Sequence, residues 1–400
     1  MIEAVARHGY ATTTVKELVA LAGVSKSAFY EHFADKQACF LATLDATMAE
    51  ATRRVSAAYR SPGDFRESMI SGLAAFMNLV VEEPAAASLA AVESLKLGIA
   101  GVAHRERASE TIELMARHSF DGAPPGREVS DVVLRAITNG VGGLVYRRIR
   151  AGRIEELPEL TELLVDWAIG YRAPDGEALT RAMAASELPP LEDPMAIPDD
   201  SKAGWGEPPD SAFSRATLSQ RERILRAAAR VVVERGYASL NIPMISAVAG
   251  TSNQTFYEHF SDKHEALLGA FEVIAAEALG YALAAFQAAG DRPEAIGTGL
   301  RALTEYCASH RMFSRLAFFE LPAAGPGALD RADFIMDSVT AFLEPDLAPS
   351  GIGGPPPKAI LEAIGTGVWA VMQREIANDR GGALPTLAPE ITRIALAPLQ

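Results

Sequence analysis

The pentapeptide Phe-Tyr-Glu-His-Phe occurs twice in the chain, at residues 29–33 and at residues 256–260. The similarity extends well beyond the two pentapeptides. Between residues 9–36 and 236–263, 14 of 28 positions are identical, and the alignment needs no gap. Such agreement indicates that the chain was built by duplication.

The offset that aligns the pentapeptides continues through most of the chain, so the repeat is a whole unit. Identical dipeptides at this offset are Gly63-Asp64 and Gly290-Asp291, Gly72-Leu73 and Gly299-Leu300, Leu89-Ala90 and Leu316-Ala317, Ala136-Ile137 and Ala363-Ile364, and Leu157-Pro158 and Leu384-Pro385. Residues 1–173 therefore correspond to residues 228–400. This period far exceeds the roughly 20 to 50 residues of solenoid repeats, and each copy is long enough to enclose its own core.

The composition is typical of a folded protein of the cytoplasm. Apolar residues make up 49% of the chain and charged residues 22%, and no uncharged apolar run is long enough to predict a membrane span. The N-terminus lacks a secretory signal, and Cys39 and Cys307 are the only cysteines, which fits a reducing compartment. A net charge of -14 argues against sequence-blind attraction to polyphosphate.

Residues 173–217, between the two copies, differ in composition from the rest of the chain. They contain seven prolines, and nine acidic residues against three basic ones. We interpret this segment as a linker. Because it carries much of the negative charge, the net charge says little about the surface of either copy.

Elsewhere apolar residues recur three and four positions apart, and no convincing alternating strand pattern is found. We therefore predict an all-α protein in which each copy has short helices in front and longer ones behind. The predicted parts are a first head at 1–45, a first core at 46–172, the linker at 173–217, a second head at 218–272 and a second core at 273–400.

The first head is predicted to contain two short helices joined by a glycine turn. Thr14 and Glu17 have the spacing at which a hydroxyl and a carboxylate cap a helix start reciprocally. Gly23 ends this helix, because glycine reaches positive φ without strain. Ser25 then caps a second helix over 26–33.

The second head repeats this pattern with different side chains. Asn241 takes the first cap position, and Pro243 falls in the first turn, where a missing N–H is tolerated. Gly250 ends the helix, and Ser252 caps the next one, over 253–260.

Phenylalanines divide the second helix of each pair into a buried face and an exposed one. Phe29 and Phe33 lie four residues apart, so we expect both to be buried. Residues 26, 27, 28, 30 and 32 are then free to face outward on a helix short enough to enter a major groove about 12 Å wide. Helix, glycine turn and helix with this polarity predict a helix-turn-helix.

These residues resemble the DNA-binding head of TetR-family regulators. The resemblance is carried by Thr12 to Leu18, Ala22 to Phe33 and Asp35-Lys36 in the first copy, and by Arg223 to Leu225, Gly236-Tyr237, Phe256 to Phe260 and Asp262-Lys263 in the second. In that family a first helix packs under the helix-turn-helix, and a helical domain behind it binds a ligand and dimerises. The resemblance implies this layout twice. The first helix of the second copy is expected at about 218–235, whereas the first copy starts opposite residue 228 and is expected to lack about two turns.

The resemblance also implies which side chains meet DNA. Tyr30, Tyr257, Lys36 and Lys263 would bind phosphates, with help from His32 and His259. The residues nearest base edges or backbone would be Ser25, Ser27 and Ala28 in the first head and Ser252, Gln254 and Thr255 in the second, flanked by Lys26 and Asn253, with Thr14 and Asn241 at the preceding helix starts. A lone Tyr-x-His on a helix is more often packing, but its occurrence in two matching motifs favours DNA contact. No basic patch supports the heads, so the inference depends on the motif.

The two heads differ at the positions that would read bases. Lys26-Ser27-Ala28 stands opposite Asn253-Gln254-Thr255. Asn253 or Gln254 suits adenine, whereas Lys26 suits guanine or a phosphate. We therefore predict an asymmetric operator with half-sites one helical turn apart, about 34 Å, or a multiple of it.

A single chain with two heads predicts internal pairing, in which each copy stands where a subunit stands in a homodimer. The pairing helices are expected at 130–150 with 159–171, against 358–377 with 388–399. Glycines at 140, 142 and 143, and at 365 and 367, favour close helix approach, although each costs about 1 kcal/mol of helix stability relative to alanine.

Three hypotheses remain open. The first is a transcription regulator, most often a repressor in such families, that a small molecule entering a core releases from its operator. The second is a DNA-binding scaffold or partner-controlled regulator without an effector. The third is an enzyme, which has little support, because the sequence contains no phosphate-binding loop, metal-ligand spacing or repeated nucleophile-base pair. No cofactor, metal or membrane partner is predicted. Scattered candidates in the cores are interpreted as core or surface residues: His104, His118, Trp167, Tyr306, His310 and Trp369.

Overall fold

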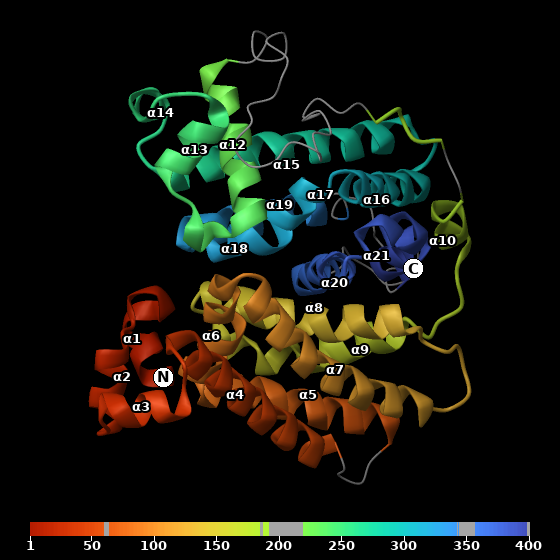
Figure 1. Ribbon diagram of the computed structural model, residues 1–400. Coiled ribbons are helices and arrows are strands. Elements are labelled where there is room, and N and C mark those ends of the chain that lie inside the picture. The colour runs from red at the N-terminus through yellow and green to blue at the C-terminus, as the bar shows by residue number, and fades with distance from the viewer. Residues whose placement is uncertain (60–63, 185–186, 192–218, 342, 344–356, 398–400) are drawn as a thin grey trace. The chain divides into compact units, whose positions relative to one another are not determined.

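The computed structural model describes residues 1–59, 64–184, 187–191, 219–341, 343 and 357–397. The described residues are mostly helical and contain no strand, which confirms the all-α prediction (Figure 1). The chain divides into two compact units. Unit 1 comprises Met1–Met183, Met336–Ala377 and Pro389–Gln400, and unit 2 comprises Ala184–Ile335 and Asn378–Ala388.

The first copy forms a head of three short helices followed by longer helices. Its elements are α1 (Ile2–Thr12), α2 (Val15–Ala22), α3 (Lys26–His32), α4 (Lys36–Tyr59), α5 (Phe65–Glu82), α6 (Pro84–Ala91), the 3-10 helix η1 (Glu93–Leu97), α7 (Ile99–Asp121), α8 (Asp131–Arg150), the 3-10 helices η2 (Ile154–Glu156) and η3 (Pro158–Leu160), and α9 (Thr161–Gly170).

The second copy repeats this order. Its elements are α12 (Gln220–Arg235), η4 (Tyr237–Ser239), α13 (Ile242–Ala249), α14 (Asn253–His259), α15 (Lys263–Ala288), α16 (Arg292–Ser309), α17 (Arg311–Arg315), the π-helix η5 (Leu316–Glu320), α18 (Leu321–Ala323), α19 (Pro326–Ala341), α20 (Lys358–Ala377), η6 (Gly381–Leu387) and α21 (Ala388–Leu396). The helices α13, α14, α16 and α20 begin and end at the positions that match the bounds of α2, α3, α5 and α8 in the first copy. The duplication is therefore a duplication of structure.

Part of the segment predicted as a linker is folded. Residues Glu177–Ala182 form α10, whose Leu179 and Ala182 are buried. The side chains of this short helix are apolar at the spacing of a helix face, a signal that the proline count of the segment concealed. Residues 185–186 and 192–217 of the predicted linker lie outside the described residues.

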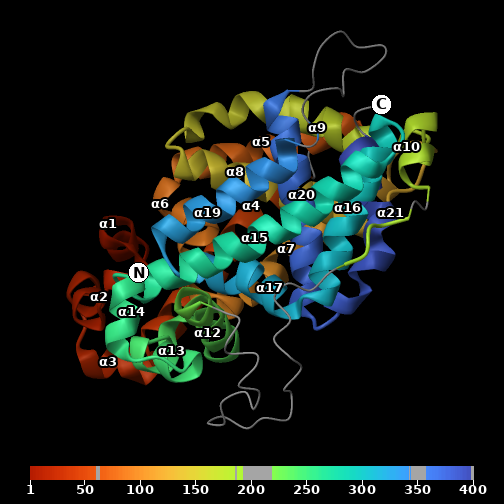
Figure 2. The same ribbon diagram turned by 90° about the horizontal axis from the view of Figure 1, so that it is seen from above.

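Unit 1 contains helices from both copies. Within it α20 packs along α8 (Figure 1 and Figure 2). A Cβ added to Gly140 would lie 2.5 Å from the carbonyl oxygen of Ala363, and one added to Gly367 would lie 2.5 Å from that of Ala136. Real Cβ atoms do not approach so closely, so glycine at these positions lets the two backbones touch.

Polar contacts reinforce this packing. Arg148 on α8 donates a hydrogen bond to Glu362 on α20 across 2.9 Å, and both side chains are buried. The Tyr171 hydroxyl, also buried, donates to the carbonyl oxygen of Ile394 on α21 across 2.7 Å. Breaking a buried ion pair leaves an uncompensated charge, so such pairs fix the register of the helices.

Among the described helices, α15 is long and apolar enough to cross a membrane by length and composition alone. Its most apolar 18-residue window has a mean hydropathy of 1.6, and half of that window is buried. The α5 and α6–η1 helices pass the same test only as a pair, which is bent by 104°. Burial of Phe271 and Ile274 explains the apolar character of α15 as that of a core helix.

Candidate nucleic-acid interface

The first head contains the predicted helix-turn-helix. The Thr14 hydroxyl accepts a hydrogen bond from the backbone N–H of Glu17 across 3.3 Å and so caps α2. The reciprocal half of this cap was predicted wrongly, because the Glu17 carboxylate faces His8 at 3.5 Å. Gly23 follows with φ of 66°, a left-handed conformation that glycine adopts without a Cβ clash. Ser25 caps α3 through the N–H of Ala28.

The second head is built the same way. Asn241 accepts a hydrogen bond from the N–H of Met244 across 3.0 Å and caps α13. Gly250 has φ of 63°, and Ser252 caps α14 by accepting from the N–H of Thr255 across 3.0 Å. In both heads the glycine turn therefore ends the first helix, and the short second helix begins, at equivalent positions of the two copies.

Phenylalanines anchor the second helices in the heads. Phe29 packs with Ala4, Leu18 and Val19 in the buried cluster of the first head. Phe33 packs against this cluster but stays partly exposed, so the prediction of full burial is wrong for this residue. In the second head both Phe256 and Phe260 are buried.

Burial of these rings leaves the opposite face of each helix open. Tyr30 is 55% exposed and Tyr257 is 60% exposed, which is high for an aromatic side chain. Each tyrosine ring stands edge-on to the buried phenylalanine before it. The other predicted residues that are exposed on or beside these helices are Thr14, Ser25, Lys26, Ser27, His32, Asn241, Ser252, Asn253, Gln254 and His259; Ala28 and Thr255 are half-buried.

The two predicted phosphate-binding lysines are engaged within the protein. The Nζ of Lys36 donates to the carbonyl oxygen of Tyr10 across 2.8 Å and lies 4.3 Å from the centre of its ring. Lys263 donates to the carbonyl oxygen of Leu240 across 2.7 Å and lies over the ring of Tyr237. Burial lowers the pKa of Lys36 below its ordinary value. Both lysines therefore hold the segment just before the second helix of their head, α2 or α13.

A second feature of each head, a hydrogen bond between the backbone after a positive-φ glycine and a buried glutamate, was not predicted from the sequence. Gly9 and Gly236 have φ of 76° and 77°; Gly9 kinks α1 near its end, and Gly236 directly follows α12. The next N–H, that of Tyr10, donates to the Glu93 carboxylate across 2.7 Å. The matching N–H of Tyr237 donates to Glu320 across 3.0 Å. Glu93 and Glu320 are buried and occupy equivalent positions of the two copies, so the repeat itself contained the signal.

The first core contains a cavity of about 540 Å³ between α4, α5, α6, α7, α8 and α9. Its lining is mostly apolar, with Phe76, Ile112 and Val145 among the side chains that face it. Arg105, Ser109 and Asn139 add polar groups, and these three residues also line a small polar pocket next to the cavity. The volume lies in the range of small-molecule sites, about 300 to 1,000 Å³.

The described residues hold no group of three or more histidine, cysteine, aspartate or glutamate side chains placed to bind a metal ion. The predicted core candidates are accounted for by packing and pairing. Trp167 and Tyr306 are buried, and the Nδ1 of His104 lies 2.9 Å from the Asp45 carboxylate.

Comparison with known proteins gives a family match at both heads. The family described as "Bacterial regulatory proteins, tetR family" matches the chain at residues 2–43 and again at residues 224–270. These ranges cover the two helix-turn-helix segments with the helices on either side of them. No curated protein matches the chain.

Solved structures with similar folds include two regulators. A TetR family transcription regulator from Marinobacter aquaeolei VT8 is 18% identical, with a TM-score of 0.34 over 43% of this chain and 94% of its own. The fatty acid degradation regulator FadR from Bacillus halodurans is 14% identical, with a TM-score of 0.37 over 45% of this chain and 95% of its own. The assignment of the heads rests on the two sequence matches.

Proposed function

We propose that this chain, a DNA-binding transcription regulator of the TetR family with two heads, is a repressor that a small molecule releases from an asymmetric operator. The observation that carries this proposal is the pair of capped helices α3 and α14, each with an exposed tyrosine and an exposed histidine beside its buried phenylalanine. A short helix with this polarity fits a major groove.

Within each head, polar side chains would divide between phosphates and bases. Tyr30 and Tyr257 would donate hydrogen bonds to phosphate oxygens, with His32 and His259 close by on the same helices. Thr14, Asn241, Ser25 and Ser252 lie at helix starts, where backbone N–H groups favour anions. Lys36 and Lys263 would place positive charge near the DNA phosphates, and their hydrogen bonds to protein carbonyl groups would stabilise each head.

The difference between the two reading helices supports an asymmetric operator. Lys26 and Asn253 are exposed at the first position of α3 and α14. An ammonium group donates only, whereas an amide both donates and accepts, so the two helices suit different base edges. Identical half-sites would satisfy one head and leave polar groups of the other without partners.

Internal pairing of the two copies is supported by the contact of α8 with α20. These are the matching helices of the duplicated units, and they meet at glycines from both. In a homodimer such a contact would join two subunits. We propose that one chain supplies both halves of a dimer, divided as heads at 1–45 and 218–272 and cores at 46–172 and 273–400.

The cavity of the first core supports control by a small molecule. An effector that binds there with different affinity in two states of the chain would shift the population between them and change DNA affinity. A regulator with no effector is the alternative, and a thermal unfolding temperature that no compound in a broad screen changes would favour it. We place the protein in the cytoplasm and assign it no catalytic activity, membrane contact or cofactor.

Footprinting on the DNA upstream of the protein's own gene tests the proposal. Tyr30→Phe and Tyr257→Phe each remove one hydrogen bond to a charged phosphate, worth about 1.5 to 3 kcal/mol. Each variant should weaken protection of a different half of the footprint by roughly 10- to 100-fold in affinity. Tyr59→Phe, in the first core, is the matched control and should leave the footprint unchanged.

A footprint that neither head variant alters would exclude the tyrosines as DNA contacts. A footprint in which both variants weaken the same half would exclude one DNA contact per head.

A further inference from the structure

The first core and the second core differ at the positions that surround the cavity. Leu79, Glu83 and Ala86 line the cavity of the first core. The residues at the equivalent positions of the second copy are Tyr306, His310 and Phe313. Three rings therefore stand in the second core where the first has one aliphatic chain, one exposed carboxylate and one methyl group.

These rings pack against one another inside unit 2. The Tyr306 ring stacks on His310 with centroids 4.1 Å apart and meets Phe313 edge-on at 5.3 Å. Tyr281, at the position that matches Arg54 of the cavity lining, lies 6.3 Å from Tyr306. Tyr306 and Phe313 are buried. Aromatic side chains of this size fill the volume that the smaller residues of the first core leave open.

The cavity of the first core also has one distinctive charged group. Arg105, on α7, lines it and is partly buried, and burial lowers the pKa of its guanidinium below the ordinary value. Among the described residues no hydrogen bond or ion pair is formed by this guanidinium. The other arginine of the lining, Arg54, pairs with Glu50 at 2.8 Å and Glu82 at 3.1 Å.

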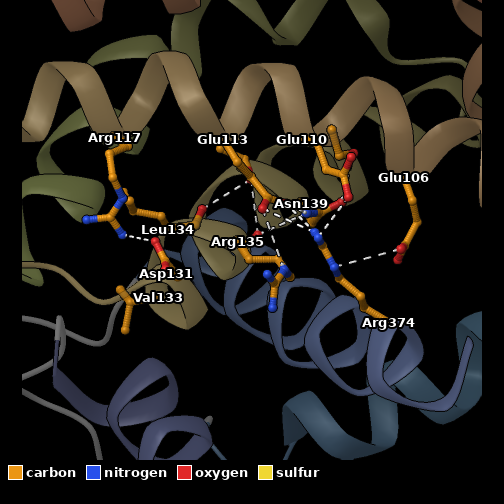
Figure 3. A network of polar contacts seen from close by, with 12 residues as sticks. Glu106, Glu110, Glu113, Arg117, Asp131, Val133, Leu134, Arg135, Asn139 and Arg374 are labelled. Atoms are coloured by element: carbon orange, nitrogen blue, oxygen red, sulfur yellow. Dashed lines mark hydrogen bonds and ion pairs between the residues drawn. The ribbon is translucent and has the colours of Figure 1, made fainter. Parts of the chain in front are cut away.

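Three carboxylates of α7 are held by other arginines, as Figure 3 shows. Arg374, from α20, lies 3.8 Å from Glu106, 2.9 Å from Glu110 and 3.3 Å from Glu113. Arg135 lies 3.6 Å from Glu113. Tyr146 and Glu106 still act on Arg105 at longer range, but the Glu106 oxygen faces Arg374. Within the part of the chain that the structure describes, the network leaves the Arg105 guanidinium as a donor without an acceptor.

Neutral polar groups lie beside this guanidinium at the same end of the cavity. The Ser109 hydroxyl donates to the Asn139 side-chain oxygen across 3.3 Å, and the Asn139 amide nitrogen donates to the carbonyl oxygen of Arg135 across 3.0 Å. A guanidinium in a mostly apolar cavity is costly unless an anion meets it. A planar carboxylate suits it best, because two parallel N–H donors match its two oxygens.

We propose that each chain binds one ligand, in the first core, and that this ligand is an amphipathic carboxylate whose apolar body fills the cavity and whose head group meets Arg105. The second core has aromatic side chains at matching positions of the cavity lining, which take up space that is open in the first core, and it has Ala332 at the position that matches Arg105. The inference rests on the proposed regulation by an effector and gives that effector a chemical class and a stoichiometry of one.

Isothermal titration calorimetry with dodecanoate and its neutral counterpart dodecanol tests the inference on the full-length chain. We expect one dodecanoate per chain and at least tenfold weaker binding of dodecanol. Arg105→Gln should weaken dodecanoate binding at least tenfold and leave dodecanol binding unchanged. Arg107→Gln, at an exposed position two residues away on α7, is the matched control and should bind as the unmodified chain does.

A second variant copies one ring of the second core into the first core. Ala86→Phe places the ring of the second copy in the cavity and should abolish binding of both compounds. Circular dichroism checks that each variant folds; if Arg105→Gln does not fold, the dodecanoate-to-dodecanol ratio and Ala86→Phe decide. Two ligands per chain, equal affinity for both compounds, or undiminished binding by Ala86→Phe would overturn the inference.

The same samples separate this inference from the proposed function. Footprinting without ligand measures DNA binding alone. Dodecanoate that binds once per chain but leaves the footprint unchanged would support the site and contradict release of DNA by its ligand. DNA binding that another compound releases, with no dodecanoate bound, would keep the proposed function and overturn the ligand class.

Discussion

The carboxylate of Glu93 accepts a hydrogen bond from the backbone N–H of Tyr10 across 2.7 Å, and it thereby joins the first core to the first head. The partner N–H lies directly after Gly9, where the positive φ ends the regular helix and exposes that donor. Glu320 and Tyr237 repeat the bond in the second copy at 3.0 Å. Because both copies have it, this bond is a regular connection between head and core.

Removing the acceptor should destabilise each copy. Glu320→Ala leaves the Tyr237 N–H without its acceptor, which costs about 1 to 3 kcal/mol for a buried group. Glu320→Gln keeps an oxygen in place and should cost less. Urea denaturation of the two variants measures the difference. Equal stability of the alanine and glutamine variants would contradict a role for this hydrogen bond.

The same glutamate predicts a pH dependence. Burial raises the pKa of Glu320 above its ordinary value, although the Tyr237 N–H and Arg315 act in the opposite direction. The folded state then binds this proton more tightly than the unfolded chain does. Stability from this group is therefore present at low pH and falls as the pH rises from the unfolded pKa, about 4.3, through the folded pKa.

Glu320→Gln removes this proton site, so the difference in unfolding free energy should shift in favour of the variant as the pH rises through that window. Urea denaturation at a series of pH values, with the variant and the unmodified chain compared at each, isolates this group. A difference that stays constant, or shifts towards the unmodified chain, would show that the carboxyl pKa is not raised.

Glycines at the contact of α8 and α20 allow a matched stability test. Gly367→Ala would place a Cβ 2.5 Å from the carbonyl oxygen of Ala136, so the helices must move apart, at a cost of about 1 to 3 kcal/mol. A Cβ at Gly142 of α8 has no atom within 4 Å. Gly142→Ala should therefore stabilise the chain by up to about 1 kcal/mol through helix propensity. Thermal unfolding that gives both variants the same sign would refute this account of the contact.

Exchanging the reading residues should change the symmetry of the preferred DNA. The triple variant Lys26→Asn, Ser27→Gln and Ala28→Thr gives both heads the same side chains at these positions. Selection from random DNA should then return two similar half-sites in place of two different ones.

The opposite exchange, Asn253→Lys, Gln254→Ser and Thr255→Ala, is the control. It should also yield similar half-sites, but with the sequence of the other half. A perfect palindrome selected by the unmodified chain would count against the asymmetric operator from the start.

The heads could be predicted closely because their determinants are local. Thr14, Ser25, Asn241 and Ser252 cap helices through nearby N–H groups of the same helix, and Gly23 and Gly250 turn the chain where the spacing requires it. The helices α8 and α20 were also predicted within one residue at each end. Local capping hydrogen bonds and helical periodicity can both be predicted from a single sequence.

The cavity and its charge could not be predicted in this way. Arg105 has no partner among the described residues because Arg374, from the other copy, occupies the neighbouring carboxylates, and only packing brings these residues together. The contact of Lys36 with the carbonyl oxygen of Tyr10 was not predicted, because every residue type has a backbone carbonyl and the sequence does not mark which one a lysine meets. Glu93 and Glu320 could have been found as a single identity between the cores, where the comparison of the copies named only identical dipeptides.

The presence of α20 in unit 1 bears on how such a regulator responds to its own abundance. Two separate subunits part when they are diluted, and each then carries a single head to DNA. Helices joined by one polypeptide meet at a fixed effective concentration, whatever the number of molecules in the cell. A few copies of this chain would therefore keep both heads paired at levels where an ordinary dimer has come apart.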